Sequence, residues 1–494
     1  MYLKKLHISN FRCFHDYEIE FAPGVTVLFG KNGSGKSTLI HAIHKAMSFL
    51  MYSEEVKEKV AKGKKAKVLE VKTFRLNNPY PAVEGFSAFD CKYEGVKRSG
   101  YEININAQAV FGNSLHLEWN MTGVFPRMSL RKSGYRSKFM ELYEWAKSTM
   151  PSPQLPLLAY YSDGFPHNTI LNRSKSTEKT KRDFHLKNSF PELGYTDWNS
   201  DKGFTNVWLE RLCNKLYRTE AIPRELNVFK RYHEAGKIDK EKYDIFKKKF
   251  QEELVVCNKE IAEITACLQR FTKGDTFLEI ASLGIDITDR TAVCAITTDM
   301  ERHKFSVLPA GYKRMLYIAL DIAYRSFLLS GGQSTDIPGL VIIDEIDLHL
   351  HPELEQVVLG RFMKTFTKAQ FVISTHSQAV LTGLSTVGEK NRIYKMEKVT
   401  TCTGDDAVQK GPVPMFDIYG LDLNTTMQLV MEVNPNDDEL NRWISRCAYM
   451  IDNGLNEQAA NLKKFIIQKG VLSEKEIDNR ISSLLKCHCH EVDK

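Results

Sequence analysis

The stretch Gly30-Lys31-Asn32-Gly33-Ser34-Gly35-Lys36-Ser37, "GKNGSGKS", fits the phosphate-binding pattern G-x-x-x-x-G-K-[ST] at every position. It follows the apolar run "VTVLF" and precedes the helix-like "KSTLIHAIHKAM". Its glycines let successive backbone N–H groups wrap around phosphate oxygens, and the helix start adds the positive end of its dipole. We therefore predict an α/β fold that binds ATP and Mg²⁺, with Lys36 on the β and γ phosphates and Ser37 on the metal. The predicted nucleotide-binding residues in and next to this loop are Gly30, Asn32, Gly33, Ser34, Gly35, Lys36, Ser37 and Thr38.

A second apolar strand, in "GLVIIDEIDLHLHPE", ends in the adjacent carboxylates Asp344 and Glu345. We predict that Asp344 holds Mg²⁺ through water and that Glu345 orients or deprotonates the attacking water. Adjacent Asp-Glu pairs also begin ordinary loops, but the P-loop favours the catalytic interpretation. In "AQFVISTHSQAVL" the pattern of strand, polar turn and helix recurs, with His376 at the strand's end. His376 is a candidate γ-phosphate contact, although a lone His at a turn is also ordinary polar surface.

The run Leu329–Gln333, "LSGGQ", spells the consensus signature of ABC-type ATPases. In those proteins the signature heads a helix of several turns that finishes before the carboxylate strand begins. Only "STDIPG" separates Gln333 from Leu340, and Pro338 forbids a helix there. We therefore predict that "LSGGQ" is a helix end closed by a glycine in the left-handed conformation.

The functional signature is predicted one helix upstream, at Leu308–Arg314 ("LPAGYKR"). It precedes a segment whose apolar residues fall on one helical face. Ala310 and Gly311 are the predicted nucleotide contacts, because the start of this helix offers backbone N–H groups. Pro309 lacks both a hydroxyl and an N–H group, which puts a direct phosphate contact from that residue in doubt.

Four segments together resemble the RecF/SMC/OLD-type branch of ABC ATPases: "LKKLHISNFRCFHDYEIEF", the P-loop, "DEIDLHLHPELEQ" and "ISTHS". The resemblance implies an ABC-type head, a mixed sheet with flanking helices, with the P-loop in an N-terminal lobe and the signature in a C-terminal lobe. It also implies a homo-oligomer, because two heads of this branch usually sandwich two ATP molecules, each completed by the partner's signature. Arg12 matches a position that often lies near the nucleotide. The residues matching the segment that lines the dimer contact are Asp347, His349, His351 and Pro352.

We expect four parts: an N-terminal ATPase lobe with basic insertions (1–222), a helical or coiled-coil insertion (223–272), a C-terminal ATPase lobe (273–400) and a small helical tail (401–494). Apolar residues at steps of three and four between Tyr243 and Leu268 indicate the helix of the insertion. It could contact another copy or pack on its own domain.

The tail lacks the length of a TOPRIM nuclease domain and contains three helical patterns instead. With the "GLDLN" turn at 420–424, it resembles the PtuA family, the ATPases of Septu anti-phage systems, relatives of which accompany some retrons. That resemblance implies a separate HNH-type nuclease partner (PtuB-like). The sequence contains no HNH pattern and no convincing nuclease carboxylate cluster. The amphipathic tail is either a docking surface for this partner or a simple C-terminal cap.

Length and charge limit the alternatives. The 494 residues include no apolar run long enough for a membrane span and no secretory signal, so we expect a cytoplasmic protein without membrane contact. The net charge of +7 gathers in basic runs at 57–67, 127–138 and 173–182, which could bind DNA or RNA or be solvated loops. The terminal "CHCH" at 487–490 is poorly spaced for one tetrahedral metal ion.

The predicted function is an ATP-binding and hydrolysing regulatory subunit of a bacterial anti-phage complex that controls the HNH-type nuclease. Two alternatives remain: a RecF-like DNA repair ATPase, and a PARIS-like sensor ATPase that scaffolds a toxin effector. A self-contained nuclease is disfavoured because no cutting residues are found.

Overall fold

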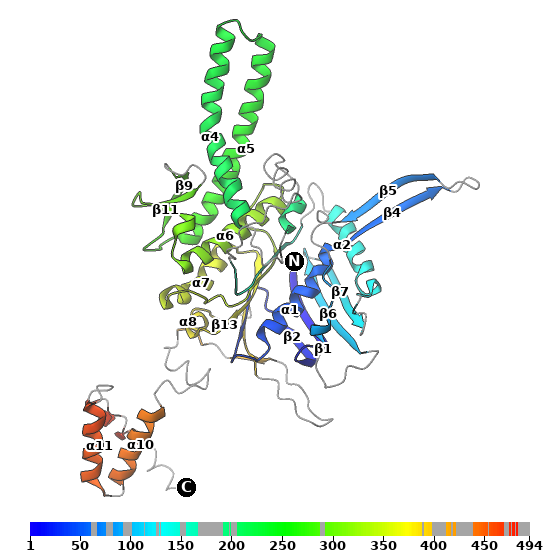
Figure 1. The fold of residues 1–494 in the computed structure, drawn as a ribbon. Helices are drawn as coiled ribbons and strands as arrows, with labels where there is room; N and C mark the ends of the chain where they lie inside the picture. The colour runs from blue at the N-terminus through cyan, green and yellow to red at the C-terminus, as the bar shows by residue number, and fades with distance from the viewer. Residues whose placement is uncertain are drawn as a thin grey trace. The chain divides into compact units, whose positions relative to one another are not determined.

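The computed structural model describes residues 1–60, 67–75, 83–91, 101–112, 114–124, 128, 130–148, 155–165, 191–196, 198, 205–286, 292–387, 390–397, 412–415, 418–420, 438–452, 454–468, 474–475, 477–479 and 481–482. It divides into two compact units, Met1–Gly420 and Leu421–Lys494, each considered by itself. The predicted fold class, mixed sheets with flanking helices and a helical insertion, is confirmed (Figure 1).

A six-stranded sheet lies at the centre of the first unit, in the order β15-β14-β3-β13-β12-β8. All its strands are parallel to their neighbours except β15, which pairs antiparallel with β14. Its strands are β3 (Val25–Phe29), β8 (Leu157–Tyr161), β12 (Gly339–Ile343), β13 (Ala369–Thr375), β14 (Asn391–Lys395) and β15 (Val413–Pro414). Every residue of β3, β12 and β13 is buried, as expected for parallel strands covered on both faces.

The register of these strands brings the sequence motifs together. Phe29 at the end of β3 pairs with Thr375 at the end of β13, and Ile343 at the end of β12 pairs with Tyr161 at the end of β8. Parallel strands all end at the same edge of a sheet, and ligands bind at that edge in open α/β folds. The P-loop, the carboxylate pair and His376 each follow one of these ends.

A four-stranded antiparallel sheet, in the order β2-β1-β6-β7, forms the second layer. Its strands are β1 (Tyr2–Phe11), β2 (Phe14–Glu20), β6 (Glu102–Phe111) and β7 (Leu115–Val124). Helix α1 (Lys36–Met47) contacts both sheets, followed by η1 (Ser48–Met51). Trp119 of β7 donates its Nε1–H to the carbonyl of Ala46 at 2.9 Å and stacks on Phe49. This packing fixes α1, which begins at the P-loop lysine, between the two layers.

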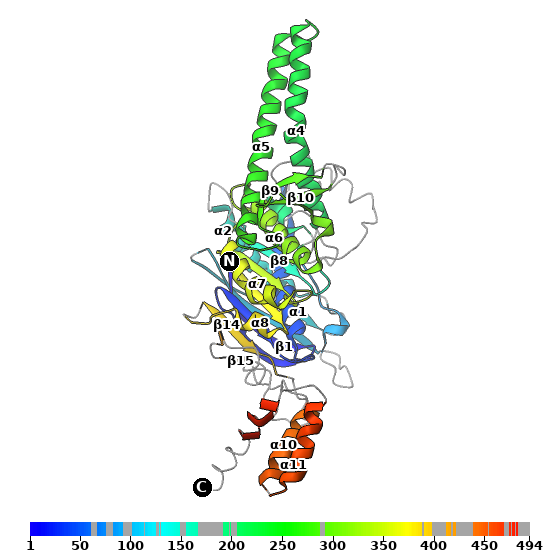
Figure 2. The ribbon, with the colours of Figure 1, turned by 90° about the vertical axis from the view of Figure 1, so that its left-hand side faces the viewer.

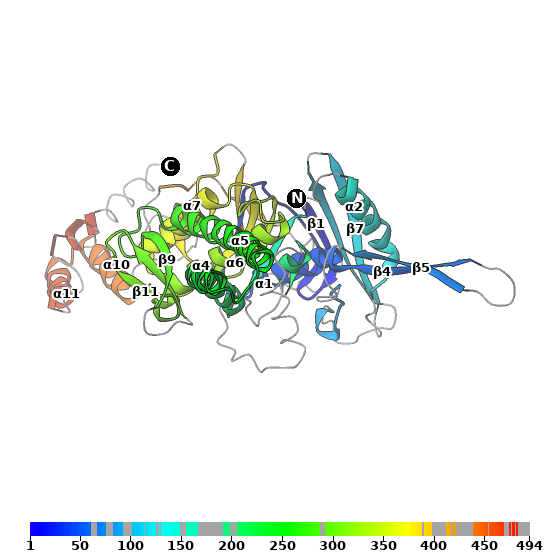
Figure 3. The same cartoon turned by 90° about the horizontal axis from the view of Figure 1, so that it is seen from above.

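The chain between η1 and β6 contains a two-stranded ribbon and a short 3-10 turn. Strands β4 (Ser53–Val60) and β5 (Lys67–Arg75) form a two-stranded ribbon that extends away from the sheet and from α2 (Arg136–Ser148), as Figure 3 shows. The segment Ser87–Cys91, "SAFDC", contains the 3-10 turn η2 (Ala88–Asp90). The turn forms because Ser87 and Asp90 cap each other's backbone N–H groups. A second short turn, η3 (Lys132–Gly134), precedes α2.

The helical insertion is a hairpin of two antiparallel helices, α4 (Thr205–Glu234) and α5 (Lys240–Thr272), which lie side by side in Figures 1 and 2. The predicted helix between Tyr243 and Leu268 is confirmed as part of α5. The hairpin begins earlier than the expected residue 223, because α4 runs on through Pro223. At its base, Arg211 and Glu260 form a buried two-point ion pair at 2.6 and 2.7 Å.

The C-terminal lobe surrounds the long, almost fully buried helix α6 (Ala310–Leu329). Its other elements are β9 (Ile280–Ile285), β10 (Val293–Thr297), β11 (Arg302–Lys304), η5 (Phe305–Val307), α7 (Pro352–Thr365) and α8 (Gln378–Thr382), and η4 (Pro191–Tyr195) packs against α6. The prediction for "LSGGQ" is confirmed: Ser330 caps α6, and Gly331 and Gly332 have φ of 64° and 79°. Their N–H groups donate to the carbonyls of Leu328 and Phe327, which closes the helix.

The second unit contains α10 (Asp438–Asp452) and α11 (Asn456–Gln468). Its core residues are Ile444, Cys447, Ala448, Ile466, Ile477 and Ile481. The "CHCH" tract and the basic run 173–182 lie outside the described residues. Among the described helices, none combines the length and the apolar character that a membrane crossing requires.

Candidate nucleotide site

The P-loop joins β3 to α1 through backbone that only glycine adopts easily. Gly35, the N-cap of α1, has φ of 95°, and a Cβ at Gly30 would lie 2.3 Å from the carbonyl oxygen of Met396. Both positions therefore exclude side chains. Ser34 Oγ is buried and has no hydrogen-bond partner within the described residues. An orphaned hydroxyl in a glycine-lined turn fits a loop that receives phosphate oxygens.

Lys36 sits at the start of α1 with its ammonium inside the loop. Its Nζ donates to the carbonyls of Gly30 at 2.8 Å and Lys31 at 3.2 Å. Burial lowers the pKa of Lys36, while the nearby carboxylates of the Asp344 segment act in the opposite direction. Ser37 and Asn32 are exposed beside it, and Thr38 is half-buried. The loop thus brings the Lys36 ammonium, an exposed hydroxyl and backbone N–H groups to one place.

The carboxylate pair follows β12 directly. Asp344 is buried, accepts a hydrogen bond from Ser374 Oγ of β13, and donates its N–H to the carbonyl of Tyr161 at 2.8 Å. Glu345 has a left-handed backbone, φ of 50°, which is strained for a residue with a side chain. Its N–H donates to Ser374 Oγ at 2.8 Å. Ser374 therefore fixes both carboxylate residues from the neighbouring strand.

Arg314 of α6 holds the same segment from the other side. Its guanidinium is buried and donates to the carbonyls of Asp344 at 2.9 Å and Glu345 at 3.1 Å. It also donates to the carbonyls of Ser162, Asp163 and Phe165 after β8. Burial lowers its pKa, against the attraction of nearby carboxylates. Arg314 thereby connects α6 to the strained backbone of Glu345.

His376 lies directly after β13, half-buried at the same edge of the sheet. Its backbone N–H donates to Asp347 Oδ1 at 3.3 Å, and the hydroxyl of Thr375 donates to the same oxygen at 2.6 Å. The segment after the carboxylate pair is therefore fastened to the turn that carries His376.

The predicted signature begins α6, with Pro309 as the N-cap residue. Pro309 and Ala310 are exposed. A Cβ at Gly311 would lie 2.6 Å from the carbonyl oxygen of His349. The start of α6 therefore lies so close to the segment after Glu345 that a side chain does not fit between them. The atoms nearest to such a Cβ belong to His349 and Leu350, in the segment after the carboxylate pair.

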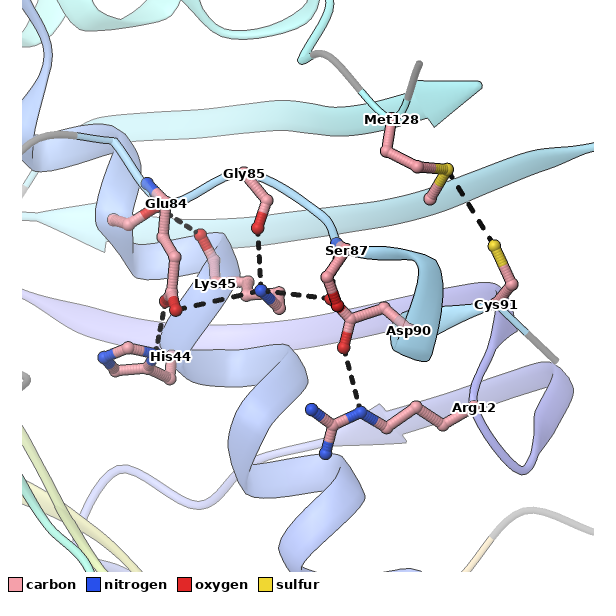
Figure 4. Close-up of polar contacts among 10 residues, drawn as sticks. Arg12, His44, Lys45, Glu84, Gly85, Ser87, Asp90, Cys91 and Met128 are labelled. Carbon is pink, nitrogen blue, oxygen red and sulfur yellow. Dashed lines mark hydrogen bonds and ion pairs between the residues drawn. The ribbon is translucent and has the colours of Figure 1, made fainter. Parts of the chain in front are cut away.

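Arg12 lies in the turn between β1 and β2, with φ of 51°. The next residue, Cys13, packs against Gly35 and bonds the side chain of Thr38, so this turn borders the P-loop. Arg12 itself donates from Nε to Asp90 Oδ1 at 3.0 Å (Figure 4). The structure thus places Arg12 beside the start of α1, although the two are distant in sequence.

Three contributors were not assigned from the sequence: Ser374, Arg314 and Asp90. Arg314 was visible as the last residue of the signature pattern, but its role depends on carbonyls from two other loops. Asp90 carried a local signal, since Ser87 and Asp90 have the spacing of a capping box. For Ser374 no signal exists in the sequence beyond its place in "ISTHS".

The described residues fit Mg²⁺ and ATP: a glycine cradle, a buried lysine, an exposed Ser37 hydroxyl and the carboxylate of Asp344 meet at the edge of a parallel sheet. A P-loop on β3 and a carboxylate pair on β12, with β13 between them, define an ATPase of the ABC type.

This chain belongs to the RecF/RecN/SMC N-terminal domain family, whose sequence model matches residues 2–401. It is 24% identical over 403 residues to the "Retron Ec83 probable ATPase" of Escherichia coli, covering 76% of this chain and 68% of that protein. It is 26% identical over 387 residues to the "Retron Vc95 probable ATPase" of Vibrio cholerae, covering 72% and 66% of the two chains. A Septu protein PtuA of Bacillus mycoides shares 36% identity over 81 residues, 16% of this chain and 11% of that protein. The matches thus span about two thirds of the retron ATPases and a small part of PtuA.

Proposed function

We propose that this protein is the ATP-binding and hydrolysing regulatory subunit of a bacterial anti-phage defence complex, and that its nucleotide state controls a separate HNH-type nuclease. One observation carries the ATPase part: Lys36, Ser37, Asp344 and Glu345 meet at the carboxyl edge of one parallel sheet. The similarity to retron ATPases and to PtuA supports the place in defence. A cytoplasmic location follows from this role.

Each residue has a definite part in the proposed hydrolysis. Bound Mg²⁺ would neutralise charge on the phosphates, held by Ser37 and, through water, by Asp344. Lys36 would exchange its carbonyl contacts for phosphate oxygens. Glu345 would orient or deprotonate the attacking water, its backbone fixed by Ser374 and Arg314. His376 would contact the γ-phosphate from the neighbouring strand end.

A second copy of the chain would complete the site. The signature begins with exposed residues: Pro309 and Ala310 are exposed, and Val307 just before them is 75% exposed. Large apolar side chains in such positions suit a contact surface. We propose that Ala310 and Gly311 of one head contact the nucleotide bound to the P-loop of the other.

The nuclease partner would bind to the second unit. Tyr449 and Leu455, at the end of α10 and before α11, are 66% and 43% exposed. Amphipathic helices that keep apolar side chains outside their own core are common docking elements. The basic runs 57–67, 127–138 and 173–182 remain our candidates for a DNA or RNA contact.

Phage plating on cells that express this protein with and without its neighbouring gene tests the proposal. Lys36→Ala and Glu345→Gln should abolish protection, and removing the neighbour should do the same. Lys31→Ala is the matched control for Lys36→Ala, because Lys31 lies in the same loop with an exposed side chain.

Three other outcomes would redirect the assignment. Protection that survives Lys36→Ala contradicts an ATP-dependent role. No protection against a broad phage panel, with ATP turnover stimulated by DNA, favours the RecF-like repair alternative. A TOPRIM-type effector gene beside this one favours the PARIS-like sensor.

A further inference from the structure

The segment Glu84–Cys91 joins two parts of the nucleotide site that are far apart in sequence. On one side it contacts the β1–β2 turn: Arg12 donates its backbone N–H to the carbonyl of Asp90 at 2.9 Å, and Phe11 bridges to Cys91. On the other side it contacts α1, where Lys45 Nζ donates to the carbonyl of Gly85 at 2.8 Å. Figure 4 shows this segment across the top of both elements.

Asp90 is the point where these contacts converge. It is 1% exposed, and both of its carboxylate oxygens are engaged. Oδ2 accepts from the N–H of Ser87 at 2.9 Å and from its hydroxyl at 3.0 Å, and lies 3.3 Å from Lys45 Nζ. Oδ1 accepts from Arg12 Nε at 3.0 Å. Because the carboxylate is fixed at several points, it also fixes the position of the Arg12 guanidinium that it binds.

Asp90 is negatively charged, which suits a residue that binds Arg12 and Lys45. Burial by itself would raise its pKa, but the Ser87 hydrogen bond and the charges of Lys45 and Arg12 outweigh burial. The pKa of Asp90 therefore lies below its usual value. The residue is an anion throughout the physiological range, and its contact with Arg12 is a charge-assisted hydrogen bond.

The geometry of Arg12 shows what the contact achieves. Asp90 takes only Nε, and within the described residues neither terminal nitrogen of Arg12 makes a hydrogen bond. The guanidinium is close enough to α1 to lower the pKa of His41, after the larger effect of burial. The two terminal nitrogens are therefore left for another anion beside α1, and phosphate oxygens match the guanidinium fork.

We propose that Asp90 is a positioning residue for ATP hydrolysis, which holds Arg12 by its Nε so that the terminal nitrogens face the phosphates bound at the P-loop. Lys45 ties this arrangement to α1, the helix that carries Lys36. A long arginine fixed before the reaction loses little freedom when charge develops on the phosphates. The proposal rests on the ATP site proposed above and adds a residue to it that touches neither nucleotide nor metal.

The first test compares Asp90→Asn with Glu84→Gln. Both changes remove one negative charge from the surroundings of Lys45, but Glu84 contacts His44 and Lys45 and does not contact Arg12. Asp90→Asn should lower kcat in single-turnover hydrolysis by about tenfold, with ATP affinity changed less than about threefold. Glu84→Gln should stay within about twofold of the parent in both. Equal kcat for these two variants overturns the proposal.

A double-mutant cycle shows whether Asp90 acts through Arg12. In the Arg12→Ala background, Asp90→Asn should cause no further fall in kcat, because the group that it positions is gone. Thermal melting of the same four proteins measures the loss of stability caused by Asp90→Asn. This loss should be present with or without Arg12, because the buried Lys45 loses its carboxylate partner in either case. Losses of kcat that multiply in the double variant would contradict a role through Arg12.

Two further variants cover the case in which Asp90→Asn does not fold. Asp90→Glu keeps the charge but moves the carboxylate, and should lower kcat only while Arg12 is present. Arg12→Lys keeps the charge but lacks Nε and the fork, and should lower kcat as much as Arg12→Ala. Full turnover by Arg12→Lys overturns the proposal.

Binding of a fluorescent ATP analogue separates this proposal from the assignment of the ATP site. Loss of binding in Lys36→Ala, with binding retained in Asp90→Asn, supports both. If the parent itself binds no ATP, both fall. If the parent binds and hydrolyses ATP while Asp90→Asn matches Glu84→Gln, the ATP site stands and the role of Asp90 falls.

Discussion

The two halves of the proposed ATP site are built to different degrees. On the P-loop half, Lys36, Asp344 and Glu345 are each fixed by contacts within the chain, from the carbonyls of Gly30 and Lys31 to the hydroxyl of Ser374. On the signature half, Pro309 and Ala310 are exposed, and Pro309, the N-cap residue of α6, has no hydroxyl to offer.

This difference indicates which steps one chain can perform alone. In the proposed site, nucleotide binding would need only the P-loop half, whose residues all lie in one chain. Rapid hydrolysis needs charge stabilisation on the far side of the phosphates, which the signature of a second copy would supply. Breaking each half in turn should therefore give different phenotypes.

Lys36→Ala should have the largest effect. It removes the buried ammonium of the P-loop half, so ATP affinity should fall by about 100-fold or more. Isothermal titration with ATP and Mg²⁺ measures this directly, with Lys31→Ala as the control. Unchanged affinity in Lys36→Ala would refute the nucleotide site.

Glu345→Gln should separate binding from turnover. The amide keeps the shape of the side chain but cannot accept a proton, so hydrolysis should fall by about 100-fold while ATP affinity stays close to that of the parent. Light scattering during size-exclusion chromatography should then show an ATP-dependent dimer. A control is Glu141→Gln, which changes an exposed carboxylate in α2, away from the predicted dimer contact. A Glu345→Gln protein that stays monomeric with ATP would count against the shared site.

Gly311→Ala tests the signature half. The added methyl would lie 2.6 Å from the carbonyl oxygen of His349, so α6 and the segment after Glu345 must separate. We expect turnover to fall by about tenfold and stability by about 1 to 3 kcal/mol. Gly360→Ala in α7 is the control, because its methyl meets nothing within 4 Å. Equal behaviour of the two variants would show that this close approach is unimportant.

Pro309→Ser should have the smallest effect, and in the opposite direction. Serine restores a hydroxyl and an N–H group at the N-cap of α6, where it is among the favoured residues. Steady-state ATP turnover should rise by about two- to fivefold. A fall in turnover would mean that the proline shapes the signature in a way that serine cannot.

Much of the P-loop half could be predicted from sequence, because its geometry is local. A glycine turn between a strand and a helix identifies Lys36, and an apolar run followed by acids identifies Asp344 and Glu345. The signal for the end of α6 at Gly331 and Gly332 was equally local, because Pro338 excluded a helix directly after them. The roles of Arg314 and Asp90 were not predictable, because each depends on which loops the fold brings beside it. Within the described part of the chain, Arg314 donates to backbone carbonyls, which carry no sequence signal.

Glu345 illustrates a trade-off between durability and catalysis. Its left-handed backbone, φ of 50°, costs on the order of 1 to 3 kcal/mol for a residue with a side chain, and glycine would relieve that cost. Selection for heat resistance alone would therefore favour a glycine at this position and a protein that binds ATP without hydrolysing it. The proposed role of Glu345 in activating water would therefore be obtained at a cost in stability that glycine would avoid.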